Sequence, residues 1–378
     1  MSGGREVPIV WERRRARAWM PDPLVDRSWS LSEPTVRRTE QAVAAVRRGS
    51  DELPTRWEAL ARLLLRAEGT ASSYLEGVTA SPAEIAVAEL DPMLGGAAAW
   101  VADNLTAVSA AVAEAHRGPL TVESLHRWHR ALMRDAGNLP AHLVGGWRDA
   151  QGWVGGTSPL DAALVPPPPE HLAALMDDLV SFANRSDVDP VTQAAMLHAQ
   201  FEVIHPYGDG NGRIGRVLVG WLLTRRLGLV SPPPFSVRIA ADRGGYLSGL
   251  TLFRLGDVDP WVAWFAGTVA DAGDATVRLV RSVGELQGSW RARLDGVRAD
   301  SAARRLVDVL PQHPVLSAGT VATELGISDR AGRTALETLA ARGVLQELGP
   351  SRRAAGRPRR WWVAGELVDA VSAWSRPG

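Results

Sequence analysis

Apolar side chains recur at every third or fourth position in residues 191–204. They are Ala194, Leu197, Phe201 and Ile204. This spacing predicts a helix rather than a strand, because residues three or four apart share one face of a helix. Asp189 and Pro190 suit the N-cap and the first turn of that helix. Pro206 disfavours the helical conformation for the residue before it, so we expect the helix to end near residue 205.

A second run of apolar residues has the same spacing and follows a short polar segment. Its members are Ile214, Val217, Leu218, Trp221 and Leu222. Arg225 and Arg226 suit the last turn of a helix, and Gly228 suits its C-terminal end. The sequence therefore predicts a second helix, with the glycine-rich residues 210–212 at its N-terminus.

The C-terminal segment, from about residue 301, predicts a different order of elements, in which helices are followed by short strands. We expect the helices at residues 302–310, after Ser317 and from Ser328 to Gly343, and the strands at 344–348 and 359–363. A helix-turn-helix followed by a β-hairpin is the pattern of a winged helix.

Two interpretations of this C-terminal segment stay open. One is DNA binding through its arginines, which would contact phosphates or enter a minor groove. The candidates are Arg330 and Arg333 on the third helix and Arg352, Arg353 and Arg357 in the basic turn between the strands. Asp329 and Glu337, on the same helix, weaken this interpretation. The other interpretation is a protein-interaction or dimerisation module.

The composition limits the chemistry. The 378-residue chain carries no net formal charge, and its 46% hydrophobic content suits about two or three globular domains. The absence of cysteine excludes thiol catalysis, disulfides and cysteinyl metal sites and fits a reducing compartment. Histidines aside, every basic residue is arginine, which excludes a Walker A lysine, a kinase strand lysine and Schiff-base chemistry. No signal peptide or apolar run of about 20 residues is apparent, so we expect a cytoplasmic protein without a membrane partner.

The loop over residues 205–216 suits a nucleotide triphosphate. Free N–H groups at a helix N-terminus and the helix dipole favour an anion, and glycines let a phosphate approach the backbone closely. Arg213 and Arg216 share one helix face and can reach the same anion. Asp209 is placed for Mg²⁺, which prefers one or two carboxylates together with phosphate oxygens.

Other interpretations of the loop are weaker. Residues 210–215 match the dinucleotide fingerprint G-x-G-x-x-G, but that site needs a preceding strand and an acidic residue about 20 positions later. Here a helix precedes the loop, and prolines occupy 232–234. A calcium loop starting at Asp209 fails, because Arg213 and Gly220 stand at ligand positions. A glycine-rich turn with a structural histidine leaves the convergence of so many polar residues unexplained.

The loop resembles H-P-F-x-[D/E]-G-N-G-R-x-x-R, the signature of the Fic (filamentation induced by cAMP) family, most of whose members transfer AMP from ATP to a protein hydroxyl. Residues 198–202 resemble the family's lead-in to this signature. The family's target-positioning flap is similar to Trp153, Val154, Gly155 and Gly156, followed by prolines 166–168. Residues 246–250 and 261–265 are similar to its later helices.

The resemblance implies a role for each residue of the loop. His205 is the general base that takes the proton of the target hydroxyl, and its ordinary pKa near working pH suits this role. Asp209 holds Mg²⁺ or Mn²⁺ against the α- and β-phosphates. Gly210, Asn211 and Gly212 form an anion hole, with Asn211 on the α-phosphate, Arg213 on the β-phosphate and Arg216 on the γ-phosphate.

Tyrosines occupy two further positions of interest. Tyr207 stands where the family usually has phenylalanine, and its hydroxyl needs a partner if the ring is buried. Tyr246 is a candidate nucleotide-binding residue that would stack on the base. A purely structural role in the core is equally consistent with the sequence.

Residues 72–77 match the family's inhibitory motif [S/T]-x-x-x-E-[G/N], with Ser72, Glu76 and Gly77 at the defined positions. In the family the glutamate pairs with the second arginine of the loop, which here implies a bidentate pair with Arg216. A guanidinium held in this way cannot also accept the γ-phosphate, so ATP would bind in a nonproductive pose. The alternative is an ordinary Glu-Gly at the end of a short surface helix.

These features predict a mainly α protein: a Fic-type helical core with a β-hairpin flap, an N-terminal helical region and a C-terminal winged helix. The expected divisions are an extended N-terminal arm (1–24), the N-terminal helical region with the inhibitory motif (25–117), the catalytic core (118–272), a connecting helix (273–300) and the winged helix (301–378).

The function implied is an autoinhibited protein adenylyltransferase that uses ATP and Mg²⁺ or Mn²⁺ to modify a Tyr, Ser or Thr hydroxyl of a target protein. One alternative is a DNA-binding transcriptional regulator whose Fic module senses nucleotide. Another is a Fic enzyme that removes AMP or transfers a different phosphate-bearing group. Phosphate contacts do not read the base, so nucleotide specificity stays open, as does the formation of a homodimer.

Overall fold

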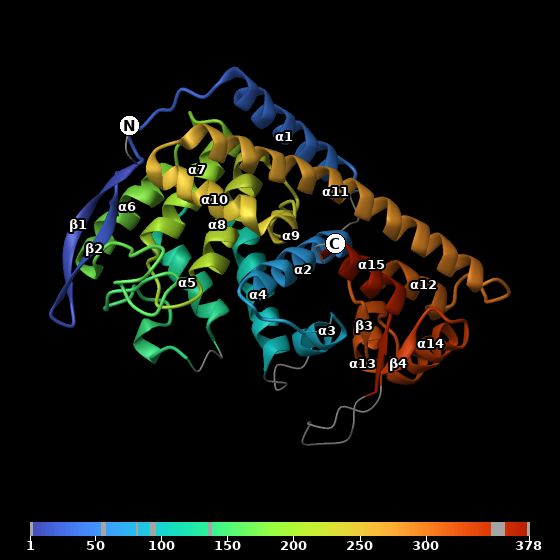
Figure 1. The fold of residues 1–378 in the computed structure, drawn as a ribbon. Helices are drawn as coiled ribbons and strands as arrows, with labels where there is room; N and C mark the ends of the chain where they lie inside the picture. The colour runs from blue at the N-terminus through green and yellow to red at the C-terminus, as the bar shows by residue number, and fades with distance from the viewer. Residues whose placement is uncertain are drawn as a thin grey trace.

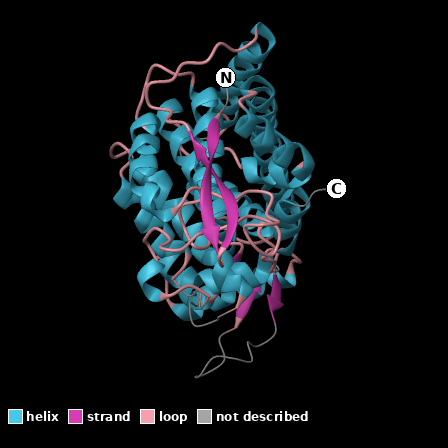
Figure 2. Cartoon of the chain, turned by 60° about the vertical axis from the view of Figure 1, so that its left-hand side comes forward, coloured by secondary structure: helices cyan, strands magenta, loops and turns pink. Residues whose placement is uncertain are grey.

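The computed structural model describes residues 3–53, 58–80, 82–90, 96–134, 138–348 and 360–375. This part of the chain is mostly helical, as the sequence predicted, with short strands near its two ends (Figures 1 and 2). The helices are α1 Glu33–Asp51, α2 Glu58–Leu75, α3 Pro82–Leu90, α4 Ala97–Ala115, α5 Val122–Leu132, α6 Leu172–Ala183, α7 Pro190–Ile204, α8 Asn211–Leu227, α9 Phe235–Ala241, α10 Arg243–Leu255, α11 Val258–Arg293, α12 Ala302–Val309, α13 Ala318–Leu325, α14 Asp329–Ala341 and α15 Gly365–Ser375. The strands are β1 Gly4–Trp11, β2 Arg14–Pro21, β3 Val315–Leu316, β4 Gln346–Leu348 and β5 Trp361–Val363. In these described ranges, no helix combines the length and the apolar character that a bilayer crossing requires.

Helices α7 and α8 lie in the centre of an extensive hydrophobic cluster. Both are buried on nearly every face, and Phe201, Leu218 and Trp221 are at most 1% exposed. Burial on nearly every face is typical of a helix in such a central position. The apolar spacing that predicted these helices therefore marks only part of their buried surface.

The ends of α7 and α8 agree with the prediction. Asp189 caps α7 by accepting hydrogen bonds from the N–H groups of Val191 and Thr192, at 3.1 and 2.8 Å. Gly228 ends α8 in the left-handed conformation, with a φ of 67°. The loop 205–210 is thus fixed between two buried helices.

Helices α1 and α11 lie side by side along one edge of the molecule and run in the same direction (Figure 1). At their beginnings, the N–H of Ser32 donates to Oδ1 of Asp259 at 2.6 Å. Further along, Gly273 has no room for a side chain, because an added Cβ would lie 2.6 Å from the carbonyl carbon of Ala45. Glycine at this position therefore lets the two helices approach closely.

The connecting helix predicted at residues 273–300 is not a separate element, because its first part belongs to a longer helix that begins at Val258. Helix α11 continues without interruption over 36 residues, from Val258 to Arg293, and so passes residue 272 without a break. Glycine has a low intrinsic helix propensity. The packing of α11 against α1 at Gly273 stabilises the helix at this position. The described chain turns only after Arg293, before α12.

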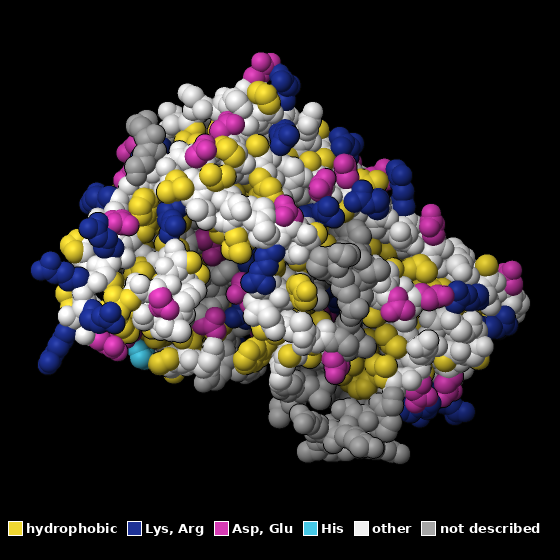
Figure 3. All heavy atoms as spheres, in the orientation of Figure 1, with side chains coloured by type: hydrophobic (Ala, Val, Ile, Leu, Met, Phe, Trp, Pro, Cys, Tyr) yellow, Lys and Arg dark blue, Asp and Glu magenta, His cyan; other side chains and the backbone are white. Residues whose placement is uncertain are grey.

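Most of the residues predicted as an extended N-terminal arm form a β-hairpin. Strands β1 and β2 pair antiparallel, with Gly4 opposite Pro21 and Trp11 opposite Arg14. The turn residues Glu12 and Arg13 both have positive φ, 47° and 65°. Such a turn usually contains asparagine or glycine, so no turn signal was present in the sequence. Figure 3 shows basic side chains at the edge of the molecule where Figure 1 places this hairpin.

The C-terminal segment contains the predicted helices α12, α13 and α14, followed by β4 and β5. The structure adds β3 and α15, and β5 lies between β3 and β4 in an antiparallel sheet. The predicted basic turn with Arg352, Arg353 and Arg357 lies outside the described residues.

This C-terminal segment packs on the helices that precede the catalytic core. Val87 of α3 clusters with Val315 and Trp361. From α2, Nη1 of Arg66 donates to the carbonyl of Gln312 at 2.9 Å. In Figure 1, α15 lies beside α2. The helix that carries the candidate inhibitory residues is thus supported from this side.

Candidate active site

The loop after α7 brings His205 to a pocket. His205 is the C-cap of α7 and adopts the left-handed conformation, with φ 49° and ψ 60°. Its Nδ1 lies 3.3 Å from the carbonyl oxygen of Glu202. A carbonyl only accepts, so the hydrogen bond requires the proton on Nδ1 and leaves the lone pair of Nε2 free. Burial lowers the pKa of His205 to about 4, so the ring is neutral at pH 7 and able to accept a proton.

Arg148 holds the backbone at His205, although it was not identified from the sequence. Its Nε donates to the carbonyl of His205 and its backbone N–H to the carbonyl of Pro206, both at 2.9 Å. Its terminal nitrogens donate to the carbonyls of Ala150 and Pro167. Burial lowers the pKa of this guanidinium to about 10. A single sequence does not distinguish an arginine bonded to main-chain oxygens in this way from a solvated one.

The first residues of α8 form an N-terminus that suits an anion. Gly210 precedes the helix with a φ of 77°, a conformation that favours glycine. A Cβ at this position would lie 3.1 Å from Leu132. The N–H groups of Asn211 and Gly212 follow at the helix N-terminus, where such groups lack intrahelical partners.

The side chain of Asn211 braces the loop. Its Oδ1 accepts from the N–H of Tyr207, and its Nδ2 donates to the carbonyl of Tyr207, both at 2.8 Å. The family resemblance implied a contact from Asn211 to the α-phosphate. The groups that these bonds leave for a phosphate are the backbone N–H and the second hydrogen of Nδ2.

Asp209 is oriented by its neighbours while 39% of its side chain stays exposed. Its Oδ1 accepts from the N–H of Gly210 and its Oδ2 from Nδ2 of Asn138, both at 2.6 Å. Its carbonyl oxygen lies 3.1 Å from Nε2 of His129. Nδ1 of His129 accepts from the N–H of Gly145 at 2.8 Å, so Nε2 carries the proton and donates to Asp209. Burial lowers the pKa of His129 to about 4, which keeps this ring neutral.

Tyr207 anchors the loop in the core and is 1% exposed. Its ring stacks on that of His129, with centroids 3.8 Å apart and an interplanar angle of 5°. Its hydroxyl lies 3.4 Å from Nδ1 of His126. This long contact gives the hydroxyl the partner that a buried tyrosine needs.

Arg213 is buried, and in the described part of the chain its charge has only a long ion pair with Asp209. The residue is 5% exposed, and its Nη2 lies 3.7 Å from Oδ1 of Asp209. Among the described residues its buried Nε has no hydrogen-bond partner. Burial lowers the pKa of Arg213. A buried donor without a partner is costly, and a phosphate oxygen would satisfy it.

Arg216 is held by the residues of the candidate inhibitory motif. Its Nε donates to Oγ of Ser72 and its Nη2 to the carbonyl of Ser72, both at 2.8 Å. Nη2 also donates to Oε1 of Glu76 at 2.7 Å. The expected pair between Glu76 and Arg216 is present, but the paired contacts come from Ser72 and the carboxylate supplies a single one.

The charges of Glu76 and Arg216 stabilise each other. Burial opposes the ionisation of both groups, but their mutual attraction prevails, so the pKa of Glu76 is lowered and that of Arg216 is raised. The same carboxylate lies against the phosphate loop, since a Cβ on Gly212 would fall 2.2 Å from Oε1 of Glu76. Glu76 therefore lies next to both the guanidinium and the loop that the resemblance assigns to phosphates.

The end of α2 explains the Glu-Gly sequence. Helix α2 ends at Leu75, and Gly77 follows in the left-handed conformation, with a φ of 78°. The N–H of Gly77 donates to the carbonyl of Tyr74 and that of Val78 to the carbonyl of Ser73, both at 3.0 Å. This is a Schellman motif, in which glycine is the preferred residue after the C-cap. The helix has 18 residues, so the expectation of a short helix was wrong.

Buried carboxyl groups of Glu68 and Glu202 lie near Arg216 and were not predicted. Glu68 of α2 accepts from the N–H of Ser236 at 2.8 Å and from its hydroxyl. Burial raises the pKa of Glu68 and that of Glu202 to about 7. Glu68 and Ser72 are four residues apart and share one face of α2, and Glu76 follows after four more residues, just beyond the end of the helix. This four-residue spacing of polar residues is the signal that could have identified Glu68.

A pocket of about 390 Å³ opens beside these groups. Its walls come from the end of α2, the flap, the loop with His205 and Arg216, and helix α10. Tyr246 of α10 touches the pocket, but it is 7% exposed and its hydroxyl lies 2.9 Å from Nε2 of the buried His198. Of the two roles left open for Tyr246, this geometry favours the structural one.

The flap borders this pocket as a short bridged turn. Val154 and Leu164 form an isolated antiparallel bridge, with the N–H of Val154 donating to the carbonyl of Leu164 at 2.8 Å. Gly155 and Gly156 have φ of 69° and 72°, which glycine adopts without strain. Trp153, just before the bridge, is partly buried.

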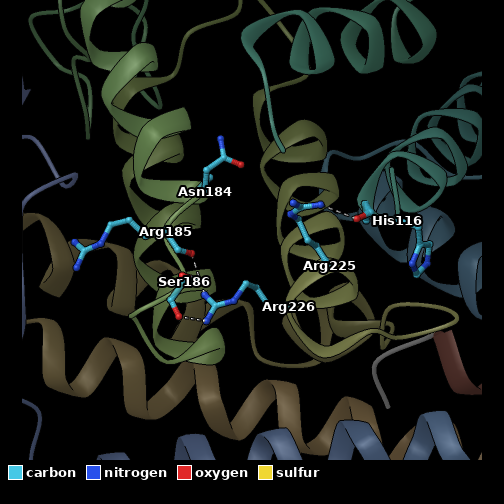
Figure 4. A pocket seen from close by; sticks show the side chains of 8 residues that line it. His116, Asn184, Arg185, Ser186, Arg225 and Arg226 are labelled. Atoms are coloured by element: carbon cyan, nitrogen blue, oxygen red, sulfur yellow. Dashed lines mark hydrogen bonds between the residues drawn. The ribbon is translucent and has the colours of Figure 1, made fainter. Parts of the chain in front are cut away.

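Another pocket, of about 470 Å³, has arginines on its walls but is not a comparable anion site (Figure 4). Arg226 donates to the carbonyls of Arg185 and Ser186 at 3.2 and 2.9 Å. Arg225 donates to the carbonyl of Ala115, the last residue of α4, at 3.2 Å. These guanidinium groups are thus already bonded to main-chain oxygens, including one at a helix C-terminus, where the dipole favours cations.

The candidate DNA-binding residues Arg330 and Arg333 are exposed on α14. In the described part of the chain, neither forms an ion pair. Glu337 of the same helix lies 3.4 Å from Arg360, which also pairs with Glu347 at 2.6 Å. This face of the C-terminal segment is therefore mixed in charge, as the sequence indicated.

Comparison with known proteins identifies the central part of the chain. Residues 119–223 match the sequence model of the Fic/DOC family. Protein adenylyltransferase Fic of Drosophila willistoni is 32% identical over 163 residues, which are 42% of this chain and 29% of that protein. Protein adenylyltransferase fic-1 of Caenorhabditis elegans is 28% identical over 150 residues, 39% of this chain and 27% of that protein. The chain thus spans less than a third of the length of these curated relatives.

Solved structures share the fold. A Fic family protein from Desulfovibrio desulfuricans G20 has a TM-score of 0.54 and 22% identity, over 89% of this chain and 98% of that one. A Fic domain-containing signaling protein from Bacteroides thetaiotaomicron has a TM-score of 0.52 and 21% identity, over 65% of this chain and 97% of that one. The signature loop, α7 and most of α8 lie inside the matched sequence segment. Residues 119–223 therefore form a domain of the Fic/DOC family, as the loop indicated.

Proposed function

We propose that this protein transfers AMP from ATP to a hydroxyl group of a target protein, and that Glu76 restrains the transfer. The observation that carries the proposal is the pocket that His205 shares with Gly212 and Arg216 at the start of α8. The names of the curated relatives support the same reaction, since both are called protein adenylyltransferases.

The transfer is a displacement at the α-phosphorus of ATP. The oxygen of the target hydroxyl forms a bond to this phosphorus while the bond to the oxygen that leads to the β-phosphate breaks, and pyrophosphate leaves. The hydroxyl proton passes to Nε2 of His205, whose Nδ1 is oriented by the carbonyl of Glu202. Arg148 positions this base by holding the carbonyl of His205. Most of the barrier reduction comes from positioning and charge neutralisation.

The phosphates bind to the N-terminus of α8 and to Arg213 and Arg216. Asp209 fits a divalent cation, because it is partly exposed and each of its oxygens has one hydrogen-bond partner, Gly210 or Asn138. Mg²⁺ or Mn²⁺ held there would neutralise charge on the α- and β-phosphates. In the described ranges no group of three acidic or histidine side chains is arranged to hold a metal, so phosphate and water oxygens would complete the ligand set.

The restraint follows from competition for Arg216. Its Nη2 and Nε are bonded to Glu76 and Ser72, and the carboxylate of Glu76 lies against Gly212 of the phosphate loop. A γ-phosphate would need the same guanidinium and would be repelled by the carboxylate. Productive ATP binding therefore requires Glu76 to move away.

The proposal is tested with ATP labelled at the α-phosphate, Mg²⁺ and a cell lysate. We expect little labelling by the wild type, strong labelling by Glu76→Gly and none when His205→Ala is added to that variant. Glu52→Gly is a matched control, because Glu52 is the exposed C-cap of α1, outside the site, and it should behave like the wild type.

Each arm can contradict the proposal. Label transferred from γ-labelled ATP would mean phosphoryl transfer, because the γ-phosphate leaves with pyrophosphate in the proposed reaction. Equal labelling by the wild type and by Glu76→Gly would contradict the proposed restraint by Glu76. Undiminished labelling without His205 would require a different base.

A second function, DNA binding by the C-terminal segment, is supported by Arg330 and Arg333, which are exposed on α14 without ion pairs in the described residues. If residues 301–378 bind DNA, the affinity should fall steeply with salt. Replacement of Arg352, Arg353 and Arg357 should lower that salt dependence. No retardation of any duplex at low salt would leave a protein-interaction module as the alternative.

A further inference from the structure

The N-terminal hairpin β1–β2 lies against the flap that borders the pocket. The ring of Trp11, the last residue of β1, meets the ring of Trp153 edge to face, with centroids 5.2 Å apart. In β2, the N–H of Trp19 donates to the carbonyl of Val165, just after the flap, at 2.8 Å. Figure 2 shows the hairpin lying on the outside of the helices. The hairpin and the flap are therefore joined at more than one point.

The flap in turn joins the hairpin to the pocket. Val154 of the flap lines the pocket together with His205. Arg254 also lines it, donates to the carbonyl of Ala163 at 3.0 Å, and lies 6.0 Å from the centre of the Trp19 ring. A protein segment that crossed the flap to present a hydroxyl to His205 would thus continue along the hairpin.

The tip of the hairpin carries unpaired positive charge. Arg13, Arg14 and Arg15 are consecutive and exposed, and within the described ranges none of them forms an ion pair. By contrast, Arg17 further along β2 pairs with Glu6 at 2.8 Å. The whole chain has no net charge, so the cluster does not simply reflect a basic protein. Basic side chains gather at this edge in Figure 3.

We propose that the hairpin tip, residues 10–15, is a docking surface for the target protein and selects a target segment with acidic residues near the modified hydroxyl. The proposal rests on the transfer activity proposed above and adds the chemical class of the target. Carboxylates on a segment that crosses the flap would pair with these arginines. Val10, which is 76% exposed, and the partly buried Trp11 would add apolar contact. DNA or an anionic membrane would favour a broader basic face than one hairpin tip that also carries Glu12.

Docking can be measured separately from transfer. The probes are two fluorescent peptides with phenylalanine in place of the acceptor tyrosine, flanked by glutamates in one and by glutamines in the other. Anisotropy at low ionic strength should show tighter binding of the glutamate peptide to the full-length protein. One exposed ion pair changes affinity by a factor of about 1.5 to 5. Replacing Arg13, Arg14 and Arg15 by glutamine should therefore weaken binding of that peptide about tenfold.

Two further variants separate charge from fold. Arg38, Arg47 and Arg281 lie exposed on α1 and α11, without ion pairs in the described residues. Their replacement by glutamine removes the same charge away from the flap and should leave peptide binding unchanged. Replacing the hairpin arginines by lysine keeps the charge and should retain most of the affinity.

Transfer provides the second readout, in the Glu76→Gly protein with tyrosine restored to both peptides. The glutamate peptide should have a kcat/KM about tenfold higher, and the hairpin glutamine variant should lose this preference with unchanged ATP affinity. Hairpin-dependent binding of the glutamate peptide without any transfer would contradict the transfer activity and support docking. Equal binding of both peptides, or an equal loss in the control variant, would overturn docking. Hairpin-dependent binding of duplex DNA or phosphatidylserine vesicles, without binding of the glutamate peptide, would overturn it as well.

Discussion

Replacing Ser72 by alanine tests whether the inhibitory motif restrains Arg216 through more than its glutamate. Oγ of Ser72 accepts from Nε of Arg216 at 2.8 Å, and Arg216 is 3% exposed. Ser72→Ala leaves this buried donor without its acceptor. A hydrogen bond to a charged group is worth about 1.5 to 3 kcal/mol.

This loss falls on the restrained arrangement and not on one in which Arg216 binds a phosphate. The equilibrium should therefore shift toward the productive arrangement by about 10- to 150-fold. If the wild type is mostly restrained, its rate of AMP transfer should rise by up to that factor. Without ATP, the Tm of Ser72→Ala should fall, because the same bond stabilises the fold.

The assay follows autotransfer of label from α-labelled ATP in the wild type, Ser72→Ala, Ser72→Thr and Glu76→Gly. Ser72→Thr keeps the hydroxyl acceptor and should stay close to the wild type. A wild-type rate in Ser72→Ala together with a lowered Tm would refute the reasoning. In that case Ser72 would stabilise the fold without contributing to the restraint.

Further predictions concern the base, the metal and a buried carboxyl group. His205→Ala in the Glu76→Gly protein should abolish transfer. It should leave ATP affinity nearly unchanged in calorimetry, since in the proposed site the phosphates contact α8 and the arginines; a parallel loss of ATP binding would contradict this. Because the base must be neutral and burial lowers the pKa of His205 to about 4, transfer should rise as pH passes through about 4 and then level off; a midpoint near 6.5 would be inconsistent with it. Asp209→Ala should remove transfer, and full activity in EDTA would exclude the metal. Burial raises the pKa of Glu68 from 4.5 to about 7, so its contribution to stability is complete below about pH 4.5. Up to about 3 kcal/mol of it is lost as pH rises from there through 7. Glu68→Gln should flatten the fall in Tm over that range, and an unchanged profile would assign the titration to another group.

The loop proposed to bind the nucleotide could be singled out from the sequence because its chemistry is local. His205, Asp209 and the N-terminus of α8 lie within residues 205–216, and the flanking helices follow from apolar spacing alone. The relation between Glu76 and Arg216 is not local, and it was predicted through the family resemblance. The structure adds that Ser72 makes the paired contacts with the guanidinium.

Features that depend on contacts between distant segments were missed. Arg148 bonds to a carbonyl 57 positions away, and no spacing rule connects it to His205. Gly273 stays helical where it packs against Ala45, and the connecting helix expected from residue 273 is part of a helix that begins at Val258. The N-terminal hairpin turns at Glu12, a residue that carries no turn signal. In each case tertiary packing overrides local preference.

The proposed restraint on Arg216 depends on how firmly α2 is held along its length. Glu68 fixes the helix to the start of α9 through Ser236, and Arg66 bonds to Gln312 of the C-terminal segment. Glu76 is beyond the last helical residue, so unwinding the final turn frees it without disturbing either contact. Moving the whole helix would break both. These routes differ in the effect of Glu68→Ala, which loosens the anchor: it should raise transfer if α2 moves as a unit. If only the last turn unwinds, Glu68→Ala should lower the Tm and leave transfer at the wild-type level.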